Sequence, residues 1–171
     1  MPINDPKEVF VQILSSLRQG TEQTTKIVQE ISQVIAYPNI KEAMEARMFV
    51  SDTILAKLDQ CFELIGEEPV KLSGRLHDVV AVDFRDEVAE IQNPMAKHLF
   101  ILATANQLIH LRTAEYVTLI AAADMTGHYG VGVLLESCLA DNLAFVERTR
   151  RLIRKIIEVK VTEKVTARSA A

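Results

Sequence analysis

Residues 38–66 read PNIKEAMEARMFVSDTILAKLDQCFELIG, and this stretch decides the fold. Its apolar residues recur three or four positions apart, which is the spacing of one face of an α-helix. Pro38 stands at the start and Gly66 directly after the last apolar residue, as at many helix boundaries. The stretch therefore predicts a long helix whose buried face carries Ile40, Met44, Met48, Ser51, Leu55, Leu58, Phe62 and Ile65.

The same spacing continues on both sides of this helix. Asp5, Pro6 and Glu8 form a helix-start pattern of N-cap, first-turn proline and capping acid, and the helix behind them runs to about Ile35. Three further helices are predicted after Gly66, and they cover about residues 72–91, 94–126 and 131–159. In the last of these, the residues expected to point inward are Leu135, Leu139, Val146, Ile153 and Ile157.

Length and composition favour one helical domain. The chain has 171 residues, a hydrophobic fraction of 49% with only 5% aromatic residues, and six Gly and five Pro. Few helix-breaking residues mean few turns and hence few, long elements. We therefore expect an all-α fold over residues 1–160, an up-down bundle of four long helices with an additional short helix, followed by a flexible C-terminal tail over 161–171.

Charge and hydropathy restrict the partners of this chain. A net charge of −4 and an isoelectric point near 5.6 argue against a nucleic-acid-binding protein, which usually carries a basic face. No run of about 18 uncharged apolar residues occurs, so we expect no membrane span. Charged residues interrupt the start before any apolar run, so we expect no signal peptide and a cytoplasmic protein. Cys61 and Cys138 stand in apolar helical contexts and are expected to be reduced core thiols.

The sequence lacks the ligand pattern of a di-metal bundle. Ferritin-like di-metal proteins supply a Glu from each of two helices and a Glu-x-x-His pair from each of the other two. No Glu-x-x-His occurs here, and the nearest pattern is Gln107-x-x-His110, in which a neutral amide replaces the carboxylate. Glycine-rich phosphate loops, Gly-x-Ser-x-Gly and Cys-x-x-Cys are also absent. We therefore expect neither a catalytic site nor a cofactor.

Five segments, in their order and spacing, resemble the YciE/YciF-like proteins, a bacterial ferritin-like family linked to stress responses and without an agreed activity. They are residues 14–26 (LSSLRQGTEQTTK), 38–45 (PNIKEAME), 57–66 (KLDQCFELIG), 114–120 (AEYVTLI) and 134–139 (LLESCL). The similarity covers about Pro6 to Arg150. The resemblance implies a ferritin-like bundle, a homodimer through a helix face, and a structural or stress-associated role.

The metal-site carboxylates of that family do not carry over to this chain. The resemblance places their positions on Thr21, Phe49, Val50, Ile54, Ile109, Arg112, Asp141 and Asn142. A single acid among these positions cannot hold two irons, which need several hard oxygen ligands. The resemblance therefore implies a degenerate, metal-free site.

Arg112 is the replacement with the largest chemical consequence, because a buried guanidinium needs a partner. We hypothesise an Arg112–Asp141 pair at the former ligand level, and the alternative is that Arg112 extends along its stem to the surface. His110 is expected to pack in the bundle. Thr21, Thr24 and Ser51 are expected to bond to their own helices rather than to line a polar pocket.

The preferred interpretation is a non-catalytic ferritin-like protein. Two alternatives stay open at this point. One is a residual ferritin-like oxidase that holds a single metal through Glu22, His110 and Asp141. The other is a small-ligand carrier that uses the vacated bundle centre, which would require a cavity between Val50, Ile54 and Ile109.

Overall fold

The computed structural model of the protein describes residues 5–35, 37–73 and 75–169; side chains are described for these residues except Val34, residues 75–77 and residues 159–169. The described chain contains helices and no strands. The helices are α1 (Pro6–Val34), α2 (Pro38–Ile65), α3 (Arg75–Glu90), α4 (Pro94–Met125) and α5 (Tyr129–Ser169).

Local capping interactions fix where these helices begin and end. The Asp5 carboxylate accepts a hydrogen bond from the backbone N–H of Lys7 at 2.9 Å, and the Asn93 side chain accepts from the N–H groups of Met95 and Ala96 at 3.0 Å. These bonds satisfy backbone donors that have no partner within the helix. After α2 the chain turns at Gly66 with a left-handed φ of 67°, which glycine adopts without steric cost.

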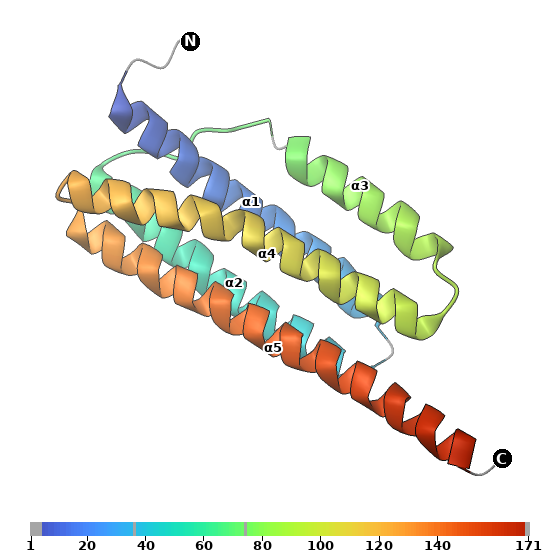
Figure 1. The fold of residues 1–171 in the computed structure, drawn as a ribbon. Helices are drawn as coiled ribbons and strands as arrows, with labels where there is room; N and C mark the ends of the chain where they lie inside the picture. Colours follow the sequence, from blue (N-terminus) through green and yellow to red (C-terminus); the bar gives the residue numbers. More distant parts are fainter. Residues whose placement is uncertain (1–4, 36, 74, 170–171) are drawn as a thin grey trace.

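Four long helices form a bundle in which α1 contacts α2 and α4, and α5 contacts the same two helices from the opposite corner (Figure 1). Neighbouring helices run antiparallel. In α2 and α5, for example, Glu42 bonds to Arg148 and Lys57 to Ser137. α3 packs outside the bundle along α1 and α4 and bridges the distance from the end of α2 to the start of α4. One such crossover is the connection found in ferritin-like bundles.

The core consists of two apolar clusters at different levels of the bundle. One cluster joins residues 10–17 of α1, 54–62 of α2, 116–123 of α4 and 131–138 of α5. The other joins residues 27–35, 40–44 and 101–109 with Phe84 and Phe145. On each long helix a short interval separates the two clusters, and these intervals lie at one level because neighbouring helices are antiparallel.

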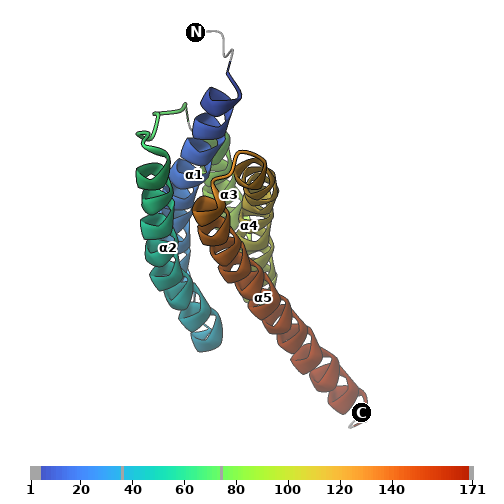
Figure 2. The same ribbon diagram turned by 90° about the vertical axis from the view of Figure 1, so that its left-hand side faces the viewer.

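The predicted ferritin-like all-α bundle with an additional short helix is confirmed. The last helix is longer than predicted, since its backbone remains helical to Ser169. Ile157 was expected to point inward, which is wrong: it is 48% exposed because α5 extends beyond its neighbours at this end (Figure 2). The flexibility of residues 161–171 stays a prediction.

Within the described chain, α5 over Tyr129–Glu158 is long and apolar enough to cross a membrane by length and composition alone. Helix packing explains part of this composition. Val131, Leu135, Cys138 and Phe145 are buried in the two core clusters against α2 and α4. The absence of a membrane span therefore stays an expectation from sequence.

The cap of α4 provides a first test of the fold. Asn93→Ala removes the side-chain oxygen that accepts two backbone hydrogen bonds, and we expect it to lower the free energy of unfolding by about 1 kcal/mol. Urea unfolding followed by circular dichroism measures this change. Gln92→Ala, an exposed substitution one residue earlier, serves as the control and should stay within about 0.5 kcal/mol of the unsubstituted protein. Equal stabilities of the two variants would contradict the capping role.

Candidate functional site

A polar layer lies between the two apolar clusters. Its buried side chains come from all four long helices, and they are Thr21 and Thr24 of α1, Arg47 and Ser51 of α2, Arg112 of α4 and Asn142 of α5. Tyr116 borders the layer from the cluster on one side. Ferritin-like di-metal proteins place their carboxylates in the core of the bundle. No Asp or Glu is among the buried residues of the described chain.

Arg47 supplies a positive charge to the interior of the bundle. Only 3% of the residue is exposed. Its Nη2 donates to the Asn142 Oδ1 at 2.7 Å, and its Cζ lies 5.4 Å from the centroid of the Phe145 ring. Burial lowers the pKa of the Arg47 guanidinium to about 10, so the group is still charged at neutral pH. An amide and an aromatic face thus provide partial compensation, without a carboxylate in direct contact.

Tyr116 and Asn142 complete the surroundings of Arg47. The Nδ2 of Asn142 donates to the Cys138 carbonyl one turn earlier at 2.9 Å, which leaves its Oδ1 free to face Arg47. Tyr116 is fully buried, and burial raises the pKa of its hydroxyl well above the usual range. Asn142, Arg47 and Thr21 lower that pKa in part, so they lie close to the hydroxyl, although none makes a hydrogen bond of normal geometry to it.

The second buried arginine, Arg112, pairs within its own helix. Its Nη1 donates to the Glu115 carboxylate at 2.6 Å and to the Ser16 carbonyl of α1 at 3.3 Å. The Ser16 hydroxyl donates to the other oxygen of Glu115 at 2.9 Å. The predicted Arg112–Asp141 pair is therefore wrong, and so is the alternative of a surface position, because Arg112 is 3% exposed. Glu115 lies one turn away on the same side of α4, which makes it the nearer partner.

Asp141 lies at the edge of the bundle. Its carboxylate accepts from Lys57 Nζ at 3.0 Å, and the carboxylate-bearing side chain is 38% exposed. Lys57 also donates to Ser137 at 2.8 Å. Asp141 is thus held between α2 and α5 by a lysine and does not enter the polar layer. Its neighbour Asn142 does so instead.

The remaining positions implied by the family resemblance divide into three groups. Ile54 and Ile109 are buried and apolar, and they belong to the two core clusters. Thr21 is buried and donates to the Leu17 carbonyl at 2.8 Å, so its predicted bond to its own helix is confirmed. The same prediction for Thr24 is wrong, because its buried hydroxyl has no hydrogen-bond partner among the described residues. Val50 is partly buried, and Phe49 is 75% exposed. The position aligned with Phe49 therefore faces away from the bundle centre.

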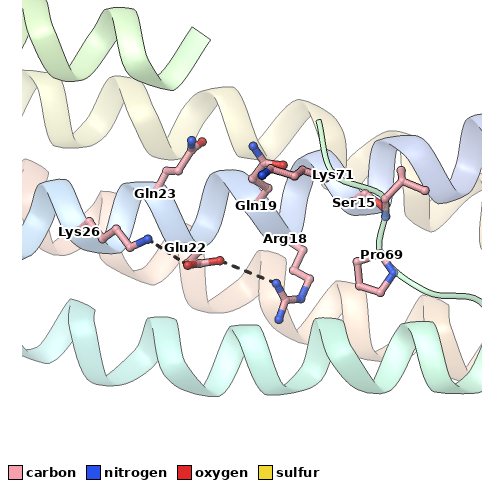
Figure 3. Close-up of a pocket in the computed structure, with 9 residues that line it drawn as sticks. Ser15, Arg18, Gln19, Glu22, Gln23, Lys26, Pro69 and Lys71 are labelled. Carbon is pink, nitrogen blue, oxygen red and sulfur yellow. Dashed lines mark hydrogen bonds and ion pairs between the residues drawn. The ribbon is translucent and has the colours of Figure 1, made fainter. Parts of the chain in front are cut away.

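The three residues of the single-metal alternative are not brought together. Glu22 lies on α1, where it pairs with Arg18 and Lys26 in the wall of a polar pocket of about 520 Å³ (Figure 3). His110 is exposed on α4, so its predicted packing role is also wrong. No group of three or more His, Cys, Asp or Glu side chains that could hold a metal occurs among the described residues.

The polar pocket beside Glu22 forms where the α2–α3 connection runs along α1. Gln19 holds this connection by donating to the Leu72 carbonyl and accepting from its N–H, at 3.2 and 3.1 Å, while the Ser15 hydroxyl accepts from the Val70 N–H at 3.0 Å. Lys71 and Gln19 also line this pocket, and Figure 3 shows both above the Glu22 ion pairs. The Glu22 carboxylate already forms ion pairs with Arg18 and Lys26, so it is not an unpaired ligand for a metal.

The donor set of the bundle centre does not fit a di-metal cofactor. Two close metal cations require several carboxylates, and the layer offers hydroxyls, one amide and two guanidinium groups. Each guanidinium would repel a metal cation at this level. The side chains of His77 lie outside the described residues and take no part in this comparison.

Both cysteines are buried free thiols, as predicted. Burial raises the pKa of Cys61 to about 12 and that of Cys138 to about 11. Thiolate is the reactive form of cysteine, so both side chains are inert at neutral pH. They act as core residues.

Sequence reasoning missed Arg47. The structure buries Met44, Arg47, Ser51, Ile54 and Leu58, which follow one another at alternating spacings of three and four. Met48 and Leu55 were predicted on this face instead, because they are apolar and lie next to the buried stripe. The helical spacing could have revealed Arg47. It lies three residues after Met44 and four residues before Ser51, and both of these were predicted to be buried.

Helix order, crossover and polar layer together define a ferritin-like bundle whose centre carries arginines where di-metal proteins carry carboxylates. A family model described as a domain of unknown function (DUF892) matches residues 5–163, and the chain belongs to this family. The resemblance to YciF-like proteins is thereby confirmed. A search of curated protein sequences gives no match.

Solved structures show the same fold at low sequence identity. The stress protein YciF of Escherichia coli has a TM-score of 0.85 at 18% identity, over 91% of this chain and 99% of that chain. YcfI from Rhodopseudomonas palustris has a TM-score of 0.82 at 20% identity, over 86% and 94%. Protein XCC3681 of Xanthomonas campestris pv. campestris has a TM-score of 0.69 at 18% identity, over 91% and 99%.

The ion pair between the buried Arg112 and the partly buried Glu115 provides a second test. Arg112→Met leaves the Glu115 carboxylate without its cation, and we expect the free energy of unfolding to fall by about 3 kcal/mol. Arg112→Met combined with Glu115→Gln should recover most of this loss, because no buried charge is then left alone. Urea unfolding measures all three proteins.

A surface pair is the matched control for this experiment. Arg85 and Glu30 form an ion pair with two hydrogen bonds, and both side chains are about half exposed. Arg85→Met should therefore cost less than about 1 kcal/mol. An equal loss for Arg85→Met and Arg112→Met would show that burial does not set the strength of the Arg112 pair.

Proposed function

We propose that this protein is a non-catalytic, metal-free member of its family with a structural, stress-associated role. The observation that carries this proposal is the guanidinium of Arg47 in the polar layer, 3% exposed and hydrogen-bonded to Asn142. A fixed positive charge in a poorly solvated interior raises the energy of any second cation placed beside it. The donor set thus supports a centre whose task is to hold the four helices together.

The role in stress is proposed from the relatives. The protein from Escherichia coli is described as a stress protein, and a structural role has been suggested for YcfI of Rhodopseudomonas palustris. Family membership supports a related task for this chain. Fold alone does not determine function, so the proposal depends on the polar layer as well.

We further propose a homodimer that forms through the outer face of α4. From Gln107 to Ala121 the exposed positions of this helix are Gln107, His110, Leu111, Ala114, Val117, Thr118 and Ala121, and none carries a formal charge. Val117 is 57% exposed. Apolar faces free of Asp, Glu, Lys and Arg are typical of the central part of protein interfaces. A second copy packed on α4 would cover this face.

Iron loading tests the metal-free proposal. Purified protein is incubated with ferrous iron under air, dialysed and submitted to elemental analysis, with a metal-free mock incubation as control. We expect no stoichiometric iron and no change in the unfolding midpoint, because the buried centre offers no carboxylate. Iron or manganese retained at one or two equivalents per chain would refute the proposal.

The α4 face is tested by light scattering after gel filtration. The unsubstituted protein should elute as a dimer, and Val117→Glu should shift it to the monomer, because a charge buried at an apolar interface is costly. Val82→Glu on α3 is the matched control, since Val82 is 51% exposed and lies on another helix. A monomeric unsubstituted protein, or a dimer unaffected by Val117→Glu, would exclude this interface.

A further inference from the structure

Arg47 borders a pocket that the proposed function does not use. The pocket has a volume of about 170 Å³ and lies between α2 and α5. Its walls include the small side chains of Ala43, Ala46 and Ala144, and its more exposed edge carries Asp141 and Arg148. The alanines leave the space open next to the guanidinium.

The two charges at the edge of the pocket are already compensated. Asp141 pairs with Lys57 and Arg148 pairs with Glu42, each at 3.0 Å. Arg47 forms no ion pair within the described chain. The surroundings of the pocket therefore retain one uncompensated positive charge, and it belongs to the most deeply buried of these groups.

Hydrogen bonding at Arg47 is also incomplete. Nη2 donates to Asn142, whereas Nε and Nη1 are buried and have no hydrogen-bond partner among the described residues. Buried donors without partners are rare in folded proteins, and a charged donor is more costly to leave unpaired than a neutral one. The ring of Phe145 covers one face of the guanidinium but accepts none of these hydrogens in the way an oxygen or a halide does.

We propose that this pocket binds a small monovalent anion, a halide or a short carboxylate, which neutralises the positive charge of Arg47. The volume suffices for such an ion, since one water molecule occupies about 30 Å³ in the liquid. The alanine side chains offer no acceptor, and the one carboxylate of the pocket, Asp141, already pairs with Lys57. The same layer that excludes cations through Arg47 thus selects an anion.

Thermal unfolding at constant ionic strength tests the proposal. The protein is kept in sodium gluconate, whose anion is bulky, and this salt is replaced stepwise by sodium chloride, bromide, formate or acetate. An anion that binds only the folded protein raises the melting temperature, by about 3–6 °C when its concentration is about ten times its dissociation constant. The comparison of halides with formate and acetate shows which of the two kinds of anion the pocket takes.

Three variants separate this site from general salt effects. Arg47→Met removes the charge, and Ala46→Leu fills the pocket while keeping Arg47; both should abolish the shift in melting temperature. Arg18→Gln is the control. Arg18 of α1 pairs with Asp59 of α2 away from this pocket, so its substitution should leave the shift unchanged. If Arg47→Met does not fold, Ala46→Leu still decides the outcome.

Crystals grown in bromide give an independent measurement. We expect an anomalous scattering peak in the pocket, in contact with Arg47 and absent from Ala46→Leu crystals. Equal shifts in all variants, or bromide bound only at surface lysines and arginines, would overturn the proposal. None of these measurements involves a metal or the oligomeric state, so the anion site can fail while the proposed function stands.

Discussion

A charge in the interior of a helix bundle has to be compensated at the place where it lies, and this constraint organises the centre of the molecule. Arg47 and Arg112 are both buried at the level between the two apolar clusters. Arg112 takes a carboxylate from its own helix, Glu115, whereas Arg47 takes an amide from α5 and the face of Phe145. Because the bond from Arg47 to Asn142 joins α2 to α5, it also fixes how these two helices align.

Apolar packing on both sides of the polar layer makes this arrangement possible. Leucine, isoleucine and valine fill each cluster, and burial of their side chains is the main favourable contribution to folding. A polar layer between such clusters contributes less to stability than an apolar one, yet it allows fewer alternative alignments of the helices. The bond from Arg47 to Asn142 joins α2 to α5, and the bond from Arg112 to the Ser16 carbonyl joins α4 to α1. Because each bond forms in one register only, the layer favours a single arrangement of helices that would otherwise slide along similar apolar faces.

Most of the fold could be predicted from the sequence, because local chemistry determines it. Asp5, Asn93 and Gly66 mark helix ends, and the three- and four-residue spacing marks the buried faces. The residues at the centre of the bundle were harder to predict. Sequence reasoning assigns charged residues to the surface because burial is costly, so Arg47 was passed over in favour of the neighbouring Met48. Asp141 across the bundle was predicted as the partner of Arg112, although Glu115, three residues along the same helix, was visible in the sequence. No spacing rule predicts that Lys57 holds Asp141 at the edge of the bundle.

Relatives at 18–20% identity keep this fold because packing requires apolar residues at given spacings and not particular side chains. The chemistry of the centre is not protected in that way. When carboxylates at this level give way to guanidinium groups, the sign of the charge in the layer reverses, and with it the kind of ion that the layer can stabilise. A chain can therefore retain the whole architecture of a ferritin-like metal protein while the electrostatics of its centre favour the opposite charge, and function has to be argued from the layer rather than from the fold.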